Sequence, residues 1–338
     1  MTAAETALKI VILDDFQDTV RHLDAYKLLR EALLQAEIDV CRDLPMSVDR
    51  LVERLANADV VVLIRERTQL TREVIERLPR LRVIVQTGRV ARDHTAHIDV
   101  AACREQGIAI LEGESDGISA AELTWTLILA ARRRLPQYLR HLESGRWQQS
   151  GLEGGGFPSG FGIGVALHGD TLGIWGYGRI GKILARYGVA FQMKILVWGS
   201  ERSRQAALAD GHAPADSRQT LFEQSDVLSV NLRQSASTLS VVTFEDLSRM
   251  KPSSLFVNTS RAGVVAPGAL LNALKLGRPG MAALDVYDEE PLSHDDPLLG
   301  MENCVCSPHI GYVEKHSYEV LFGSAFENLI AHLKQERG

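Results

Sequence analysis

The ten residues from Leu172 to Gly181 (LGIWGYGRIG) constrain the fold of this 338-residue chain more than any other stretch. Apolar residues lead into three glycines spaced Gly-x-Gly-x-x-Gly, which predicts a buried strand that turns tightly into a helix. Gly176 permits the tight turn, Gly178 lets the backbone approach a pyrophosphate, and Gly181 lets the helix pack closely on its strand. An anionic diphosphate would lie at the positive N-terminus of that helix. The pattern therefore predicts a dinucleotide-binding turn.

The residues that follow support this interpretation, which the glycine spacing alone would not, because glycines mark many ordinary turns. A helical stretch covers residues 182–191, and Lys194–Trp198 is a second apolar strand, so the segment completes a βαβ unit. We expect the other residues of the turn, Tyr177, Arg179 and Ile180, to bind the cofactor together with the glycines.

The end of the second strand bears on the choice of cofactor. A site selective for NAD places Asp or Glu there, about 20 residues beyond the glycines, to bond the ribose hydroxyls. That position is Gly199 in this chain, and no carboxylate stands there. Ser200, Arg202 or Arg204 could instead donate hydrogen bonds to a ribose phosphate. We therefore expect NAD(P) as cofactor, with NADP(H) favoured; the alternative is that the arginines cap a helix and Glu201 holds NAD(H).

Strands and helices alternate along the whole chain, which predicts an α/β protein with two Rossmann-like, doubly wound parallel sheets. The longest helix is expected over residues 119–142, with Ser119 and Glu122 forming a capping box, and Arg132–Arg134 is interpreted as a helix end. The glycine-rich segment Gly145–Gly169 is expected to be a flexible connection over the surface or across a subunit boundary. Strands are expected at 9–13, 60–64, 81–85, 107–111, 227–231, 255–258, 281–285 and 304–306, and further helices at 23–36, 98–106, 243–250, 267–276 and 315–334.

The composition excludes several classes of protein. A formal net charge of -6 gives no basic surface for nucleic acid, and the longest apolar runs are far too short to span a bilayer. The first ten residues lack the pattern of a secretion signal, so a cytoplasmic location is expected. Cys41, Cys103, Cys304 and Cys306 are too few and too scattered for a disulfide framework or a tetrahedral metal site. We expect reduced, buried thiols and no metal.

Three strand ends in the second half of the chain carry polar groups that suit one reaction. Hydride transfer to a 2-oxo acid needs a cation for the carboxylate, a proton donor for the carbonyl oxygen, and a group that tunes this donor. Arg261, His309 and Glu290 fit these roles, because a carboxylate beside a histidine favours the imidazolium form. Each residue alone could equally form a salt bridge or cap a loop.

Four motifs occur in the order typical of one family: the glycine turn, NTSRAG at 258–263, ALDVYDEEPL at 283–292 and SPHIG at 307–311. In these the chain resembles the D-isomer-specific 2-hydroxyacid dehydrogenases, which include phosphoglycerate and glyoxylate/hydroxypyruvate enzymes. The resemblance implies an NAD(P)-dependent oxidoreductase that interconverts a small 2-oxo acid and a D-2-hydroxy acid. It also implies a substrate domain of residues 1–115 and 312–338, an inserted nucleotide domain of residues 116–311, and an active site in the cleft between them.

The resemblance also assigns roles to individual residues. Arg261 would bind the substrate carboxylate, His309 would be the acid/base, and Glu290 would be its partner. The remaining expected binding residues are Asn231, Thr259 and Asp285 for the cofactor, with Asp285 at the nicotinamide amide, and Arg65, Gly88 and Arg89 for the substrate. The sequence departs from the family at the turn 87–94, which is longer and more basic than usual, and at Tyr312, where a small residue is common.

Other activities share parts of this pattern. Phosphite dehydrogenases keep the same three catalytic residue types, whereas formate dehydrogenases pair their histidine with glutamine, so Glu290 argues against the latter. Transcriptional corepressors of this fold also keep the three residue types and use NAD(H) binding to control assembly. The resemblance and the segment Gly145–Gly169 together predict a homodimer formed through the nucleotide domain.

Overall fold

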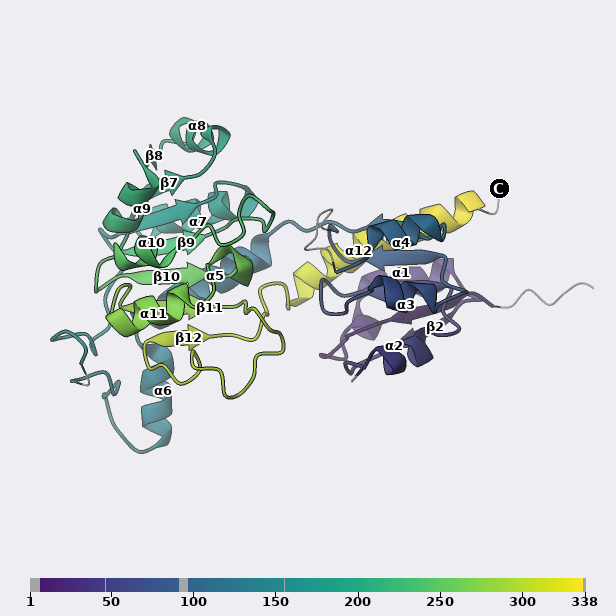
Figure 1. Ribbon diagram of the computed structural model, residues 1–338, viewed down its shortest axis with the longest axis horizontal. Coiled ribbons are helices and arrows are strands. Elements are labelled where there is room, and N and C mark those ends of the chain that lie inside the picture. The colour runs from purple at the N-terminus through teal and green to yellow at the C-terminus, as the bar shows by residue number, and fades with distance from the viewer. Residues whose placement is uncertain (1–6, 46, 91–96, 155, 337–338) are drawn as a thin grey trace, which may run out of the picture. The chain divides into compact units, whose positions relative to one another are not determined.

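The computed structural model describes residues 7–45, 47–90, 97–154 and 156–336, and Figure 1 follows the chain through them. The chain divides into two compact units. Unit 1 comprises Met1–Asp116 and Val313–Gly338, and unit 2 comprises Gly117–Tyr312. Each unit is built on one sheet in which every paired strand is parallel to its neighbour. The predicted α/β class with two doubly wound sheets is confirmed.

Unit 1 contains a five-stranded sheet in the order β2-β1-β3-β4-β5. Its strands are β1 (Lys9–Ile12), β2 (Glu37–Val40), β3 (Val60–Leu63), β4 (Val83–Gln86) and β5 (Ala109–Glu112). Its helices are η1 (Val20–His22), α1 (Asp24–Ala32), α2 (Val48–Leu55), α3 (Arg72–Glu76), α4 (Val100–Glu105) and α12 (Lys315–Glu336).

Helices cover both faces of this sheet, and the central strands are therefore continuously apolar. All four residues of β3 and of β4 are buried, as expected for parallel strands between two helical layers. Side chains of α2, α3 and α4 join one core cluster on the first face, and α12 contacts α1, β4 and β5. The strand order reverses between β1 and β3, and ligands of such sheets meet the loops at the carboxyl ends of strands beside this reversal.

Unit 2 contains a seven-stranded sheet in the order β12-β11-β10-β9-β6-β7-β8. Its strands are β6 (Thr171–Trp175), β7 (Lys194–Trp198), β8 (Ala213–Pro214), β9 (Val227–Val230), β10 (Leu255–Asn258), β11 (Met281–Leu284) and β12 (Cys304–Cys306). Its helices are α5 (Ile118–Arg132), α6 (Leu135–Glu143), α7 (Arg179–Ala190), α8 (Glu201–Ala209), α9 (Arg218–Gln224), α10 (Phe244–Ser248), η2 (Ala262–Val264) and α11 (Ala269–Leu276).

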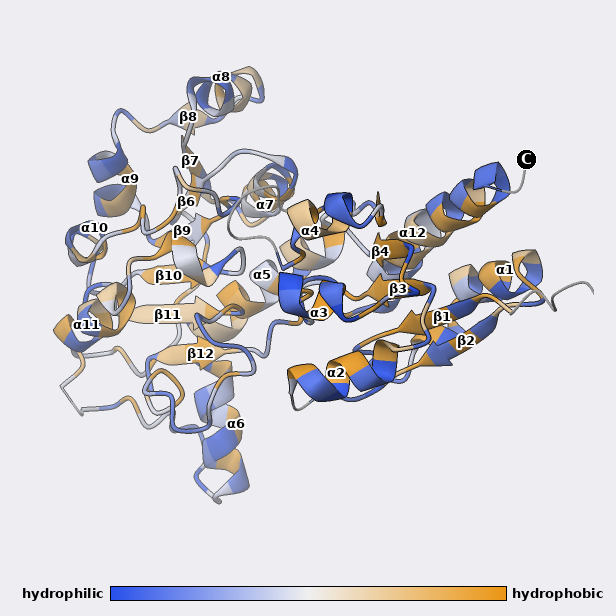
Figure 2. Cartoon of the chain, turned by 45° about the vertical axis from the view of Figure 1, so that its right-hand side comes forward, coloured by the Kyte–Doolittle hydropathy of each residue, from blue (hydrophilic) through white to orange (hydrophobic). Residues whose placement is uncertain are grey.

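Alternate side chains of one strand pack into two separate cores on opposite faces of the unit 2 sheet. This holds for β6, β7, β9, β10, β11 and β12. On β10, Leu255 and Val257 join the core formed with α5 and α7, whereas Phe256 joins the core formed with α9, α10 and α11. Figure 2 shows the apolar strands of both sheets between helices whose outer faces are hydrophilic. The layers are those of a doubly wound sheet, and the strand order reverses between β6 and β9.

The strand register determines which loops share an edge in unit 2. Trp175 of β6 pairs with Trp198 and Val230, Val230 pairs with Asn258, and Leu284 pairs with Asn258 and Cys306. The residues that follow these pairs therefore leave the sheet side by side at its carboxyl edge. They are Gly176, Gly199, Asn231, Thr259, Asp285 and Ser307.

The expected single helix over residues 119–142 is wrong, because two helices occupy this stretch. Arg134 adopts a left-handed backbone with a φ of 57° between α5 and α6. Pro136 lies in the first turn of α6, where a missing N–H costs nothing, but it could not continue α5. The carbonyl of Arg132 instead accepts a hydrogen bond from the Val165 N–H at 2.8 Å. The interpretation of Arg132–Arg134 as a helix end is confirmed.

The expected capping box is also wrong. Helix α5 begins at Ile118, and its N-cap is Gly117 in the left-handed conformation, with no side-chain cap. Ser119 lies inside the first turn and is buried. The start of the helix is thus determined by the backbone freedom of glycine rather than by a hydroxyl.

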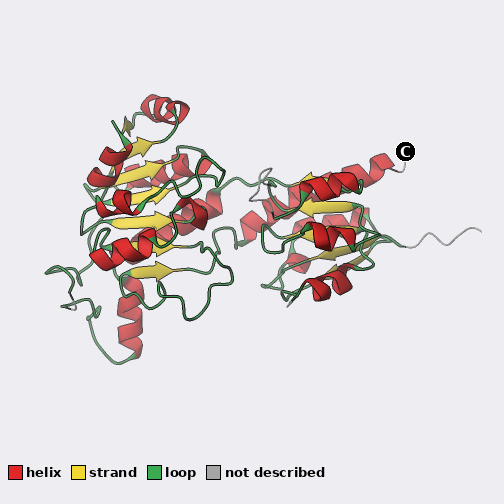
Figure 3. Ribbon diagram, in the orientation of Figure 1, coloured by secondary structure: helices red, strands yellow, loops and turns green. Residues whose placement is uncertain are grey.

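The described residues of the glycine-rich connection, 145–154 and 156–169, form no helix or strand between α6 and β6 (Figure 3). It is nevertheless anchored, since Leu152, Phe161 and Leu167 are buried in the core of unit 2. Phe161 also packs beneath the Arg134 guanidinium, whose Cζ atom lies 4.3 Å from the ring centroid. The connection is therefore a packed part of unit 2 and not simply a flexible surface segment.

Several short elements escaped the sequence analysis. They are β2, α2, α3, α8, β8 and α9. All of them are short, and apart from β8, which is only Ala213–Pro214, they are rich in charged or polar residues, so few positions carry an apolar period. In the part of the chain that the structure describes, no helix is long and apolar enough to cross a membrane. The cytoplasmic location stays a prediction.

Candidate active site

The glycine turn is formed by three glycines with three different surroundings. Gly176 has a φ of 100°, and a Cβ atom there would lie 2.6 Å from the Asn231 carbonyl oxygen. A Cβ on Gly181 would lie 2.3 Å from the carbonyl oxygen of Gly176, so α7 packs directly on the turn. A Cβ on Gly178 would meet nothing within 4 Å. The open space lies at the N-terminus of α7, where a diphosphate fits.

The side chains within the turn differ in their surroundings. Tyr177 is buried, and its hydroxyl donates to Asp210 at 3.0 Å, so only its backbone can serve a diphosphate. Arg179 is exposed, and Ile180 is half-buried against the core of unit 2. The turn therefore offers backbone groups and one exposed cation to a ligand.

The end of β7 carries an arginine held in a defined position. The Arg204 guanidinium stacks on Trp198, with its Cζ atom 4.8 Å from the ring centroid, and donates to the Gly199 carbonyl at 2.9 Å. It also pairs with Glu201 at 2.5 Å. Ser200 caps α8 through the Ser203 N–H. A guanidinium paired with the Glu201 carboxylate thus lies beside Gly199.

Two further strand ends lie at the same edge. Asn231 donates to the Ser229 carbonyl at 3.2 Å. The Thr259 hydroxyl lies 2.7 Å from the hydroxyl of Thr124 on α5. Sequence analysis missed Thr124, because a buried threonine within an apolar helix has no local signature.

The carboxylate of Asp285 holds together the loop that follows β12. One oxygen accepts hydrogen bonds from the Ser307 hydroxyl at 2.6 Å and the Ile310 N–H at 2.9 Å, and the other accepts from the Gly311 N–H at 2.8 Å. Burial raises the pKa of Asp285, while these donors and the nearby His309 lower it in part, leaving a pKa above the ordinary value. Asp285 is therefore an anchor for the loop that carries His309.

The His309 ring contacts the Glu290 carboxylate directly. The distance from His309 Nδ1 to Glu290 Oε2 is 2.5 Å, and the second Glu290 oxygen accepts from the Tyr287 N–H at 2.9 Å. His309 is 26% exposed and Glu290 35% exposed, so both meet solvent. Since Nδ1 is occupied by Glu290, the ring has Nε2 left for a substrate. Tyr312 lies edge-on to the ring with a centroid distance of 5.8 Å.

Two positive groups act on Glu290. Burial alone would raise the pKa of this carboxyl, but the hydrogen bond and charge of His309, the Tyr287 N–H and the charge of Arg261 outweigh it. The pKa of Glu290 consequently lies below the ordinary value. Arg261 is half-buried, and its backbone carbonyl accepts from Asn258 at 2.9 Å. The structure thus brings Arg261, Glu290 and His309 into one electrostatic cluster.

The expected substrate residues of unit 1 follow β3 and β4, beside the reversal in strand order. A Cβ on Gly88 would lie 2.1 Å from Nη1 of Arg65, so the guanidinium lies against the glycine backbone. The Arg65 backbone has a φ of 56°, and it is held by Thr87 through its N–H and by Gln86 through its carbonyl. The structure brings Arg65 and Gly88 together.

Arg89 is separate from this pair. It is 65% exposed, and its guanidinium lies 3.9 Å from the Glu114 carboxylate, a distance that gives a weak surface ion pair. The rest of the basic turn, residues 91–94, lies outside the described residues. Gln86 was missed by the sequence analysis, although it links Arg65 to the buried His97.

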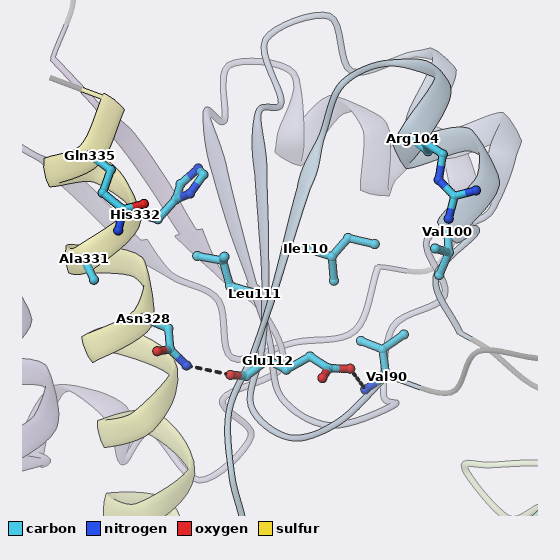
Figure 4. A pocket seen from close by; sticks show the side chains of 10 residues that line it. All are labelled: Val90, Val100, Arg104, Ile110, Leu111, Glu112, Asn328, Ala331, His332 and Gln335. Carbon is cyan, nitrogen blue, oxygen red and sulfur yellow. Dashed lines mark hydrogen bonds between the residues drawn. The ribbon is translucent and has the colours of Figure 1, made fainter. Parts of the chain in front are cut away.

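A groove of about 610 Å³ in unit 1 lies away from these strand ends. Figure 4 shows that it follows edge strand β5, with Arg104 of α4 on one side and His332 of α12 on the other. The Asn328 amide donates to the Glu112 carbonyl across it at 2.9 Å. None of the expected site residues lines the groove.

The comparisons with known proteins agree with this geometry. The family model for the NAD-binding domain of D-isomer-specific 2-hydroxyacid dehydrogenases matches residues 125–311. The chain belongs to that family. A glyoxylate reductase from Thermococcus litoralis is 33% identical over 305 residues, which cover 89% of this chain and 88% of the relative. The family's enzymes are nicotinamide-dependent oxidoreductases of 2-oxo and 2-hydroxy acids, and this dehydrogenase is one of them.

Two further relatives show how much of a related protein the chain covers and how similar the folds are. A D-3-phosphoglycerate dehydrogenase from Methanocaldococcus jannaschii is 34% identical over 305 residues, and the chain spans about half of it (53%). A crystal structure from Ralstonia solanacearum, described as a candidate D-3-phosphoglycerate dehydrogenase, is 52% identical with a TM-score of 0.94. It covers 97% of this chain and 95% of its own. The resemblance inferred from four motifs is confirmed.

The glycine turn makes a prediction about stability. Gly181→Ala places a methyl group against the Gly176 carbonyl and should destabilise the fold by on the order of 1–3 kcal/mol, since α7 must move outward. Gly178→Ala, three residues earlier, meets open space and should leave unfolding unchanged. Denaturant unfolding of both variants would measure this, and equal stabilities would contradict the close contact between helix and turn.

Proposed function

We propose that this dehydrogenase reduces a small 2-oxo acid to the D-2-hydroxy acid, with His309 as the acid/base. The observation that carries the proposal is the 2.5 Å contact between His309 Nδ1 and Glu290 Oε2. In this arrangement His309 is oriented to donate a proton from Nε2 to the carbonyl oxygen of the substrate, and Arg261 binds the substrate carboxylate. The bound nicotinamide supplies the hydride in this direction and accepts it in the reverse one.

The groups around the histidine divide the remaining tasks. Glu290 stays ionised because its pKa is lowered, and as an anion it stabilises the imidazolium that must form before proton donation. We propose that Arg65 and Gly88 add contacts to the same substrate. We further propose that Asn231 and Thr259, together with the turn 176–181, hold the cofactor, and that the fully buried Asp285 acts through the loop that it anchors.

The function is tested with a panel of acids. We expect NAD(P)H oxidation, followed by absorbance, with at least one of glyoxylate, hydroxypyruvate, pyruvate, phenylpyruvate and 3-phosphohydroxypyruvate. His309→Ala should lower kcat on that acid by on the order of a hundredfold while cofactor binding stays intact. His294→Ala, which changes an exposed histidine (91%) in the preceding loop, is the matched control. No turnover of any acid would instead favour a nucleotide-sensing role like that of the corepressors.

The Glu290 carboxylate makes a prediction about pH. In Glu290→Gln the imidazolium loses its anionic partner, so the ring should lose its proton at lower pH than in the wild type. The oxidation rate, which needs the neutral ring, should then persist to lower pH than in the wild type. As the pH rises, the reduction rate, which needs the imidazolium, should begin to fall at a lower pH than in the wild type. Profiles of kcat/KM in both directions measure this shift. The neighbouring Glu289→Gln is the control, and a profile unchanged in Glu290→Gln would reject the pairing.

The end of β7 supports a proposal about the cofactor. We propose that NADPH is used at least as efficiently as NADH, because the Arg204 guanidinium is already held beside Gly199 and Arg202 is exposed next to it. Arg202→Ala and Arg204→Ala should raise KM for NADPH and leave KM for NADH little changed. Strong NADH preference, unaffected by these substitutions, would point to Glu201 as the ribose ligand.

An exposed apolar stripe on unit 2 supports the proposal of a homodimer. Leu135, Leu139 and Leu142 lie on one face of α6 and are each about half exposed, and Trp147 just beyond is 74% exposed. Contiguous exposed apolar side chains mark interaction surfaces. Leu139→Glu should therefore shift a dimeric mass toward a monomer in light scattering. Leu34→Glu, at an exposed leucine of unit 1, should not. A monomeric wild type at micromolar concentration would reject the proposal.

A further inference from the structure

The two cysteines of β12 are in contact beside the active-site loop. Cys304 and Cys306 project from the same face of the strand, since alternate residues share a face, and their Sγ atoms are 3.7 Å apart. Both cysteines are free and of intermediate burial, and they pack against the core that unit 2 forms with α9, α10 and α11. Cys41 is also of intermediate burial, so the expectation of buried thiols is wrong for these three residues. We propose that Cys304 and Cys306 are a reversible oxidation site, converted by peroxides into a disulfide within the strand.

The surroundings of the pair give its members different roles. The hydrogen bond from Cys304 lowers the pKa of Cys306 below the ordinary value, against the opposing effect of burial, and Tyr287 lowers it further. The same hydrogen bond and burial raise the pKa of Cys304. Thiolates are the species that peroxides oxidise. Cys306 is therefore the attacking sulfur and Cys304 the resolving thiol.

The reaction needs only a peroxide as oxidant. The Cys306 thiolate attacks a peroxide oxygen, an S–O bond forms, the O–O bond breaks, and the released alkoxide or hydroxide takes a proton from water. The Cys304 sulfur then attacks the resulting sulfenic acid, an S–S bond forms, and the S–O bond breaks. The hydroxide leaves as water with the proton of Cys304. The two sulfurs together lose two electrons, and a dithiol reductant reverses the step.

A disulfide at this position would disturb the loop of His309. The two Sγ atoms would have to close from 3.7 Å to bonding distance. Residues i and i+2 of a strand are about 6.6 Å apart, near the upper limit of about 6.8 Å for the Cα atoms of a disulfide, so β12 would have to adjust. The next residue is Ser307, whose N–H donates to the Leu284 carbonyl at 2.9 Å and whose hydroxyl donates to Asp285 at 2.6 Å. Movement of Ser307 would weaken the anchor of the loop. Oxidation should therefore inhibit the enzyme, a consequence that rests on the proposed role of His309.

Mass spectrometry tests the chemistry without reference to activity. Full-length protein with its cofactor is treated with hydrogen peroxide, cleared of peroxide with catalase, denatured, alkylated and digested. We expect the peptide containing both cysteines to lose two hydrogens and to escape alkylation, and dithiothreitol to restore both thiols. In Cys304→Ser, which lacks the resolving thiol, dimedone should label Cys306. A peptide that stays fully alkylated, while Cys41 is oxidised, would overturn the proposal.

Activity measurements test the coupling to the site. Peroxide should lower kcat/KM of the wild type by on the order of tenfold to a hundredfold, as expected for a small displacement of a catalytic group, and dithiothreitol should restore it. Cys41→Ser, at a partly exposed thiol of unit 1, should behave like the wild type, whereas Cys306→Ser should resist inhibition. Inhibition of Cys306→Ser at the wild-type rate would overturn the proposal. A disulfide that forms without loss of activity would overturn the coupling alone, and the His309→Ala test stays independent of it.

Discussion

The arrangement of the candidate catalytic side chains depends on one buried carboxylate. Asp285 has no exposed surface, and a buried charge is stable only when hydrogen bonds replace the lost water. Its three donors come from residues on both sides of His309. The hydrogen bonds that satisfy the buried Asp285 oxygens are therefore also the hydrogen bonds that hold the His309 loop in shape. Loss of the Gly311 N–H would leave the second buried oxygen without its donor, and the loop would be the first part to move.

The fold of both units could be predicted from the sequence because their central strands are strongly apolar and glycine marks the first turn of unit 2. The meeting of the candidate site residues of unit 2 at one edge could also be predicted, since parallel strands in register bring their following residues together. Arg261, Glu290 and His309 lie far apart in the sequence, and only the order β10-β11-β12 makes them neighbours. The order of the four motifs along the chain predicted that these residues would be neighbours.

Other features could not be predicted, because they depend on contacts between distant segments. The break at Arg134 depends on Val165, which takes over the freed carbonyl of Arg132. The contact between the two thiols of β12 is known only from the positions of the side chains in the structure. A Cys-x-Cys spacing in the sequence is equally compatible with two inert residues. The Arg204 guanidinium of α8 stacks on the ring of Trp198 at the end of β7, and no local sequence pattern predicts this contact.

The backbone of His309 has a consequence for the balance between function and stability. Its φ of 50° lies in the left-handed region, where a residue with a Cβ atom carries a cost of about 1 kcal/mol that glycine and asparagine largely avoid. The backbone at position 309 would therefore adopt this conformation more readily with glycine than with histidine. If variants were selected for thermal stability alone, we expect His309 to be replaced. If activity were selected as well, we expect His309 to be kept, so the frequency of histidine at this position would report how strongly activity is selected.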